Sequence, residues 1–228
     1  GLYGLVSVYV YSFYYMHVQK NNVLNNKTTL LSDFNQADET MTEKAALHSG
    51  VEGSLQLRLD LIRKAKETLL VSQYSIGVDK SGLLFINELK EAADRGVEIK
   101  LLVNRFSNKV NHNSYLSVLD SYENVEIKVV GGVNLLKPWE MNNVLHDKLI
   151  IVDNDYLLSS GRNINDRFQI VESEENLVDD LDIIIENTEQ ERHPKLIEEG
   201  KNYYELLWHT DYAKPKKKYL NSKWIRHT

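Results

Sequence analysis

Between Ser54 and Val130 the chain alternates segments that have helical spacing of apolar residues with short, β-branched apolar runs. These two periods predict strands at 68–76, 97–103 and 125–130 and helices at 54–66, 82–95 and 113–122. A strand that is followed by a helix and then by another strand usually runs parallel to that next strand. We therefore predict an α/β fold with a mixed, largely parallel β-sheet that is flanked by helices on both faces.

A β-hairpin is expected after this region. The apolar run 149–152 is followed by the turn residues Asp153, Asn154 and Asp155, and a second strand begins at Tyr156. Side chains alternate along a strand, so His146 and Lys148 should share one face while the residue between them points the other way.

The hairpin is followed by Ser159-Ser160-Gly161-Arg162-Asn163, a turn of small and polar residues. Its backbone N–H groups and the Asn163 amide could bind an anion. A phosphodiester would suit this set, because Lys148 can neutralise nonbridging oxygens, Asn163 can donate a hydrogen bond, and the His146 imidazole can attack phosphorus. The alternative is that this histidine and lysine are ordinary structural residues near a strand start.

These residues resemble the phospholipase D superfamily. His146, Lys148 and Asp153 fit its H-x-K-x-x-x-x-D signature, Gly161 and Asn163 fall on its G-S/G-x-N element, and SGRNIND resembles the GGRNIGD variant of bacterial cardiolipin-synthase-like members. The flanking segments SLQLRLDLIRKAKETLLVSQYSI, ELKEAADRGVEIKLLVN, DDLDIIIEN and YYELLWH also resemble the first half of that subgroup, over roughly residues 51 to 209.

The resemblance implies a role for each site residue. His146 would be the nucleophile of a phosphohistidine mechanism, and Lys148, Gly161 and Asn163 would bind the substrate phosphate. An acidic residue would orient the imidazole from behind, and Asp180 is the best match, with Asp182 and Asp166 in reserve. Asp153 belongs to the signature, but its place on a turn predicts that it holds the turn through hydrogen bonds to its own backbone.

Composition, together with the resemblance, divides the chain into four expected regions. Residues 1–19 are a possible membrane anchor, because positions 1–18 carry no formal charge and are rich in tyrosine. Residues 20–50 are expected to form a polar linker, 51–210 the phospholipase D-like catalytic domain, and 211–228 a basic tail or a linker to a second half. These features predict an association with the bacterial cell membrane.

The formal net charge of −6 argues against an extended nucleic-acid surface, and the absence of cysteine excludes disulfides and thiolate catalysis. No histidine pair has metal-ligand spacing, so no metal and no other cofactor are expected. The predicted partners are a glycerophospholipid substrate and the membrane.

The resemblance thus implies a phosphatidyltransferase similar to cardiolipin synthase. One alternative is a phospholipase D-type phosphodiesterase or endonuclease, and another is a non-catalytic membrane-associated module. The mechanism needs two imidazoles, and one intact motif is present, since His193-Pro194-Lys195 has Gly200 where the aspartate should be. The second imidazole is expected from a following half of the full-length chain, which we favour, or from a homodimer partner.

Overall fold

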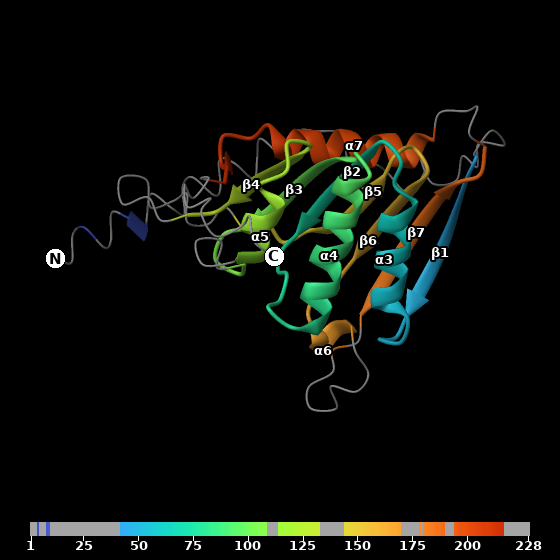
Figure 1. Ribbon diagram of the computed structural model, residues 1–228, viewed down its shortest axis with the longest axis horizontal. Helices are drawn as coiled ribbons and strands as arrows, with labels where there is room; N and C mark the ends of the chain where they lie inside the picture. The colour runs from blue at the N-terminus through green and yellow to red at the C-terminus, as the bar shows by residue number, and fades with distance from the viewer. Residues whose placement is uncertain are drawn as a thin grey trace.

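The computed structural model describes residues 42–108, 114–132, 144–169, 178, 180–189 and 194–216, together with the isolated positions 4, 8 and 9. Its strands are β1 (Glu43–Ser49), β2 (Thr68–Gln73), β3 (Glu98–Asn104), β4 (Val125–Val130), β5 (Lys148–Val152), β6 (Tyr156–Ser160), β7 (Leu181–Asn187) and β8 (Ala213–Pro215). The helices are α3 (Ser54–Lys64), α4 (Lys80–Asp94), α5 (Ser114–Leu119), α6 (Asp166–Gln169) and α7 (Lys195–Trp208) (Figure 1).

The strands form one sheet in the order β1, β7, β6, β5, β2, β3, β4, β8. Two neighbouring pairs, β2 with β3 and β3 with β4, run parallel, and the other five pairs run antiparallel. The predicted mixed α/β fold is confirmed, but the expectation that the sheet is largely parallel is wrong. Parallel pairing needs a helical crossover between strands, whereas β5 and β6 are joined by a tight turn, and β7 then returns beside β6.

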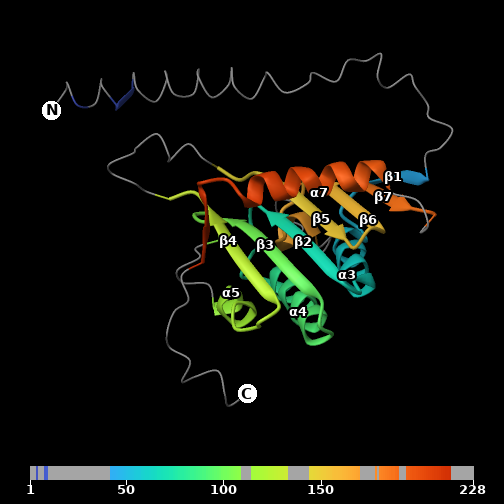
Figure 2. The same cartoon turned by 90° about the horizontal axis from the view of Figure 1, so that it is seen from above.

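Helices cover both faces of the sheet, as the alternation predicts. In Figure 2, α7 lies on one side of the sheet and α3, α4 and α5 lie on the other. The larger apolar core lies under α3, α4 and α5, and the smaller one lies under α7. The larger core contains Ile62, Phe85, Leu89, Val71 and Leu101, whereas the smaller contains Leu70, Ile151, Ile197, Tyr204 and Trp208.

Two of the expected unstructured regions contribute strands at the sheet edges. Residues 43–49, which we expected in a polar linker, form β1 and pair with β7. Residues 213–215, which we expected in a basic tail, form β8 and pair with β4. An edge strand is half solvated and carries few apolar residues, so its sequence resembles a linker until a partner strand is in place.

The possible membrane anchor at 1–19 lies almost wholly outside the described residues. None of the helices in the part of the chain described above is long and apolar enough to cross a bilayer.

Candidate active site at one end of the sheet

Except for Asp153, the predicted site residues lie on segments that meet at one end of the central strands. His146 and Lys148 lie at the start of β5, and the bend 160–163 follows the end of β6. Asp180 directly precedes β7, which pairs with β6 so that Ser160 lies opposite Asp182. The end of β2 completes this edge, since Gln73 lies opposite Lys148. Four strands therefore bring together residues that lie far apart in sequence.

His146 and Lys148 lie side by side, as strand alternation predicts. The Lys148 ammonium lies 3.3 Å from Nδ1 and 3.2 Å from Nε2 of the His146 ring, and it donates to the His146 carbonyl at 2.9 Å. Asp147 points to the opposite side of the sheet, where its carboxylate accepts a hydrogen bond of 2.9 Å from the Tyr203 hydroxyl on α7. The imidazole and the ammonium can therefore contact the same phosphoryl group.

Tyr74 forms a wall beside these two groups. Its ring lies 4.7 Å from the His146 ring, measured between centroids, and Lys148 Nζ lies 5.4 Å from the Tyr74 centroid. Its backbone N–H donates to the Asp147 carbonyl at 2.9 Å, which fixes the end of β2 against the start of β5. Tyr74 thus limits the movement of the His146 ring, which is otherwise exposed.

Lys148 is only 6% exposed. Burial lowers the pKa of its ammonium, and the negative charges of Asp180 and Asp147 oppose this effect. A partly desolvated cation attracts a phosphate more strongly than a hydrated one does. Lys148 should therefore attract a phosphate more strongly than an exposed lysine does. It should also lose its proton at a lower pH than an exposed lysine.

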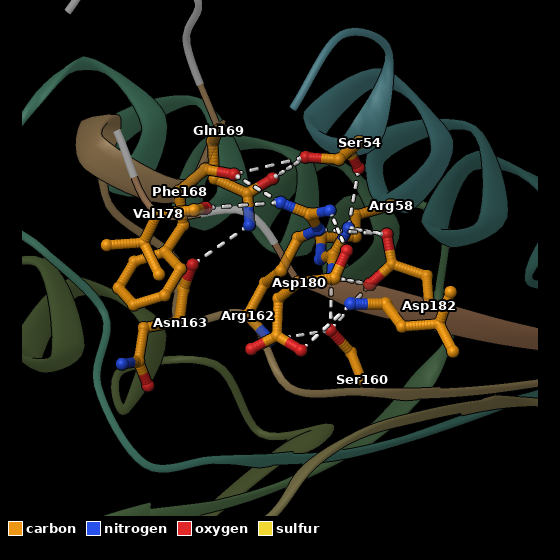
Figure 3. Close-up of polar contacts among 11 residues, drawn as sticks. Ser54, Arg58, Ser160, Arg162, Asn163, Phe168, Gln169, Val178, Asp180 and Asp182 are labelled. Carbon is orange, nitrogen blue, oxygen red and sulfur yellow. Dashed lines mark hydrogen bonds and ion pairs between the residues drawn. The ribbon is translucent and has the colours of Figure 1, made fainter. Parts of the chain in front are cut away.

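Asn163 lies on the bend with its side chain turned away from the arginines in Figure 3. Its backbone carbonyl accepts from Gln169 Nε2 at 2.8 Å, which holds the bend. Its side-chain oxygen Oδ1 is buried and has no hydrogen-bond partner among the residues that the structure describes. An amide oxygen only accepts hydrogen bonds, so the part of Asn163 that could donate to a phosphate is its NH2 group.

Gly161 is required by its neighbour Asp180. A Cβ atom at position 161 would overlap the Asp180 carboxylate, so a residue with a side chain would displace that carboxylate. Asp180 also accepts from the Leu181 N–H at 2.8 Å, and its charge acts on Lys148.

The two reserve carboxylates make other contacts. Asp182 is fully buried and binds the Arg58 guanidinium at 2.7 and 3.2 Å, while Ser160 Oγ donates to it at 2.6 Å (Figure 3). Asp166 accepts from the backbone N–H and the hydroxyl of Ser81 at 2.8 and 2.7 Å, at the start of α4. Of the three carboxylates, Asp180 therefore remains the candidate for supporting His146.

Two buried arginines near the site were not predicted. Arg58 and Arg162 are both fully buried, and both form ion pairs with Asp182. Burial lowers the pKa of Arg58, and Asp182 opposes this effect. The available signal was that Arg58 falls on the apolar face of its helix, between Leu55 and Ile62.

Arg162 connects the bend to the segment that precedes β7. Its guanidinium donates to the carbonyls of Phe168 at 3.5 Å and Val178 at 3.4 Å, and also to the carbonyl of Asp180 (Figure 3). Arg162 therefore links the bend that contains Gly161 and Asn163 to the backbone of Asp180.

Asp153 lies at the far end of β5 from Lys148. It has a φ of 49°, and its carboxylate accepts from the backbone N–H groups of Lys66, Glu67 and Thr68 at 2.9, 3.0 and 2.6 Å. We predicted that it holds its own turn, but these hydrogen bonds go instead to the connection between α3 and β2. Asp153 therefore joins two neighbouring strands.

Comparison with known proteins identifies a matching family and a similar relative. The family model described as "Cardiolipin synthase, PLD-like domain" matches residues 59–208. Cardiolipin synthase C of Escherichia coli K12 is 33% identical over 136 residues, which cover 56% of this chain and 28% of that protein. The chain thus spans less than a third of the length of this relative.

Two solved structures have a similar fold. Nuc from Salmonella typhimurium, a phospholipase D family member, has a TM-score of 0.56 at 19% identity and covers 76% of this chain and 97% of its own. NucT from Helicobacter pylori has a TM-score of 0.57 at 18% identity and covers 76% of this chain and 99% of its own. Because the family model covers more than half of the residues, the chain belongs to the phospholipase D-like domain family of cardiolipin synthases.

Proposed function

We propose that this chain is a phospholipase D-like half of a phosphatidyltransferase that acts on glycerophospholipid phosphodiesters through a phosphohistidine. The observation that carries the proposal is the distance of 3.2 to 3.3 Å between the Lys148 ammonium and the two ring nitrogens of His146. A phosphoryl group that lies within reach of the imidazole would also contact the ammonium.

Each side chain has one role in this proposal. A nitrogen of the neutral His146 ring forms a bond to phosphorus while the bond from phosphorus to the leaving alcohol breaks. Lys148 and Asn163 stabilise the charge on the nonbridging oxygens, with the backbone of Gly161 nearby. Asp180 orients the imidazole and stabilises its positive charge.

The cycle also needs a second imidazole. It protonates the leaving alkoxide and then activates the incoming alcohol, and it would come from a second motif in the full-length protein or from a homodimer partner.

A lipid substrate is favoured over a nucleic acid by the net charge of −6 and by the uncharged start of the chain. Relatives named cardiolipin synthase support the same choice and an association with the bacterial membrane. A phosphodiesterase of the same superfamily is the alternative, because it would use the same residues on the same group. Turnover of DNA without turnover of lipid would favour that alternative.

The test is a phosphodiester with p-nitrophenol as the leaving group, which departs without protonation and so requires one imidazole. The wild-type chain should release nitrophenolate and gain a phosphate adduct that is stable in alkali and labile in acid. We expect His146→Ala to lower the rate of nitrophenolate release by about a thousandfold or more, because the nucleophile is lost. The exposed His209 provides the control, because His209→Ala should retain the wild-type rate. A His146→Ala variant with the wild-type rate would contradict the proposal.

A further inference from the structure

Arg58 on helix α3 connects that helix to the bend 160–163. Its side chain is fully buried, and its guanidinium donates to both carboxylate oxygens of Asp182 at 2.7 and 3.2 Å (Figure 3). It also donates to Ser160 Oγ at 2.7 Å and to the Ser54 carbonyl at 2.7 Å. Each terminal nitrogen of the guanidinium thus makes two hydrogen bonds, and three of the four hydrogen bonds go to residues far along the chain.

Ser160 joins Arg58 to the backbone of the bend. Its hydroxyl donates to Asp182 at 2.6 Å, and it accepts from Arg58 at 2.7 Å and from the backbone N–H of Arg162 at 2.8 Å. A hydroxyl has one hydrogen to donate and two lone pairs to accept with, so these three hydrogen bonds use its full capacity. Ser160 therefore serves the network and has no hydrogen bond left for a substrate.

Two routes lead from α3 to the residues that flank the proposed phosphate site. On the first route, the bend that Arg58 holds carries Arg162, whose guanidinium donates to the carbonyl of Asp180. On the second route, Ser54 Oγ donates to Gln169 Oε1 at 2.6 Å, and Gln169 Nε2 donates to the carbonyl of Asn163 at 2.8 Å. One helix thus constrains the backbone at both Asp180 and Asn163.

Stability alone explains this network poorly. Arg58 and Arg162 are both buried, and both form ion pairs with Asp182. Moving such charges out of water costs free energy that their attraction only partly returns, and apolar side chains of similar size often give a fold of equal stability. Apolar side chains cannot supply directed hydrogen bonds that hold a backbone in one place. The network is therefore explained better by the geometry that it fixes.

We propose that Arg58 is a positioning residue of the site. It fixes the bend 160–163 and the backbone of Asp180, and it thereby places Asn163 and Asp180 for the attack of His146 on phosphorus. The inference rests on the proposed function and adds to it a residue that does not touch the substrate. A displacement of about 1 Å at a reacting group can cost about a hundredfold in rate. Loss of Arg58 should therefore slow the chemical step.

The experiment measures nitrophenolate release by the full chain from the p-nitrophenyl ester of dihexanoyl phosphatidic acid, at saturating substrate in a stopped-flow instrument. The amplitude of the first release counts the folded chains, and its rate constant reports the chemical step. Arg58→Met should lower the rate constant by about tenfold to a hundredfold, with the wild-type amplitude per folded chain. A role in stability alone would lower the amplitude of the whole sample and leave the rate constant unchanged.

Ser160→Ala is the second variant, because it removes the link between Arg58 and the bend and leaves every charge in place. It should lower the same rate constant by about tenfold, and it decides alone if Arg58→Met does not fold. Lys216→Met is the matched control. Lys216 is also buried and ion-paired, with Asp120 at 3.3 Å, but it lies beside β8 at the far edge of the sheet. Its loss should leave the rate constant at the wild-type value.

A wild-type rate constant in Ser160→Ala, or a loss of amplitude alone in Arg58→Met, overturns the positioning role. An equal loss of rate constant in Lys216→Met also overturns it, because the effect would then not depend on the bend. The phosphohistidine chemistry stays in place in each of these cases. A wild-type chain that releases no nitrophenolate overturns the proposed function and the positioning role with it.

Discussion

Residues of one sequence signature occupy two different places in this molecule. His146 and Lys148 lie at one end of β5, where their side chains are 3.2 to 3.3 Å apart. Asp153 lies at the other end and accepts three backbone hydrogen bonds from the connection between α3 and β2. The spacing of the signature is thus the length of a strand, and in the proposed function one end serves the reaction while Asp153 at the other end serves folding.

Asp153→Ala should therefore lower stability without changing the chemistry. Three N–H groups would lose their acceptor, so we expect the free energy of unfolding in urea to fall by about 1–3 kcal/mol. The amount of nitrophenolate released per folded chain should stay at the wild-type value. Asp155→Ala in the same turn is the control, and it should change neither quantity by much. A rate loss in folded Asp153→Ala would show that the residue acts in the reaction.

At the scale of elements, α7 depends on a strand that is remote in sequence. Its N-cap residue, Pro194, provides no side-chain hydrogen bond. Instead, the carboxylate of Glu43 on β1 accepts from the N–H groups of Leu196 and Ile197 at 3.0 and 2.9 Å. A negative charge at this end of the helix also interacts favourably with the helix dipole. The edge strand thus supports the helix that packs behind the site.

Removing this cap should destabilise the domain measurably. We expect Glu43→Ala to lower the free energy of unfolding by about 1 kcal/mol, the typical cost of losing a helix cap. Lys44→Ala, at the exposed next position of β1, should have little effect. Thermal and urea unfolding followed by circular dichroism would test both variants. Equal stability of the two variants would mean that the contact with Glu43 contributes nothing to α7.

At the scale of the whole molecule, one motif can perform only part of the proposed cycle. Attack on an activated ester needs His146, but release of the phosphoryl group needs a second base to activate water or an alcohol. The chain spans 28% of the length of Cardiolipin synthase C. In the proposed function, the second imidazole comes from a second motif in the full-length protein. A homodimer is the other source.

We therefore expect the chain, when it is monomeric, to release about one equivalent of nitrophenolate and then stop, because a covalent intermediate accumulates when its breakdown is slow. Stopped-flow absorbance would give the amplitude, and sedimentation would give the state of association at the same concentrations. A steady rate that increases with dimer content would indicate a site shared between two copies. Steady turnover by a monomer would contradict the need for a second imidazole.

The sequence alone determined the local features of this protein. Periodicity predicted α3, α4 and the β5–β6 hairpin to within a few residues, because helical and strand spacing are local properties. The alternation of side chains also gave the shared face of His146 and Lys148. The family resemblance, which the family model confirms, also came from local motifs.

Tertiary structure decided everything that depends on contacts between remote segments. The antiparallel strand pairs and the edge strands β1 and β8 depend on which strands become neighbours. The sequence of a single strand does not specify its neighbour. The burial of Arg58 beside Asp182, 124 residues later, has the same cause. The close approach of Gly161 to the Asp180 carboxylate also depends on contacts between remote segments. The position of a residue in a helix or strand determines the face on which its side chain lies. Which residues that side chain contacts is determined only by the tertiary structure.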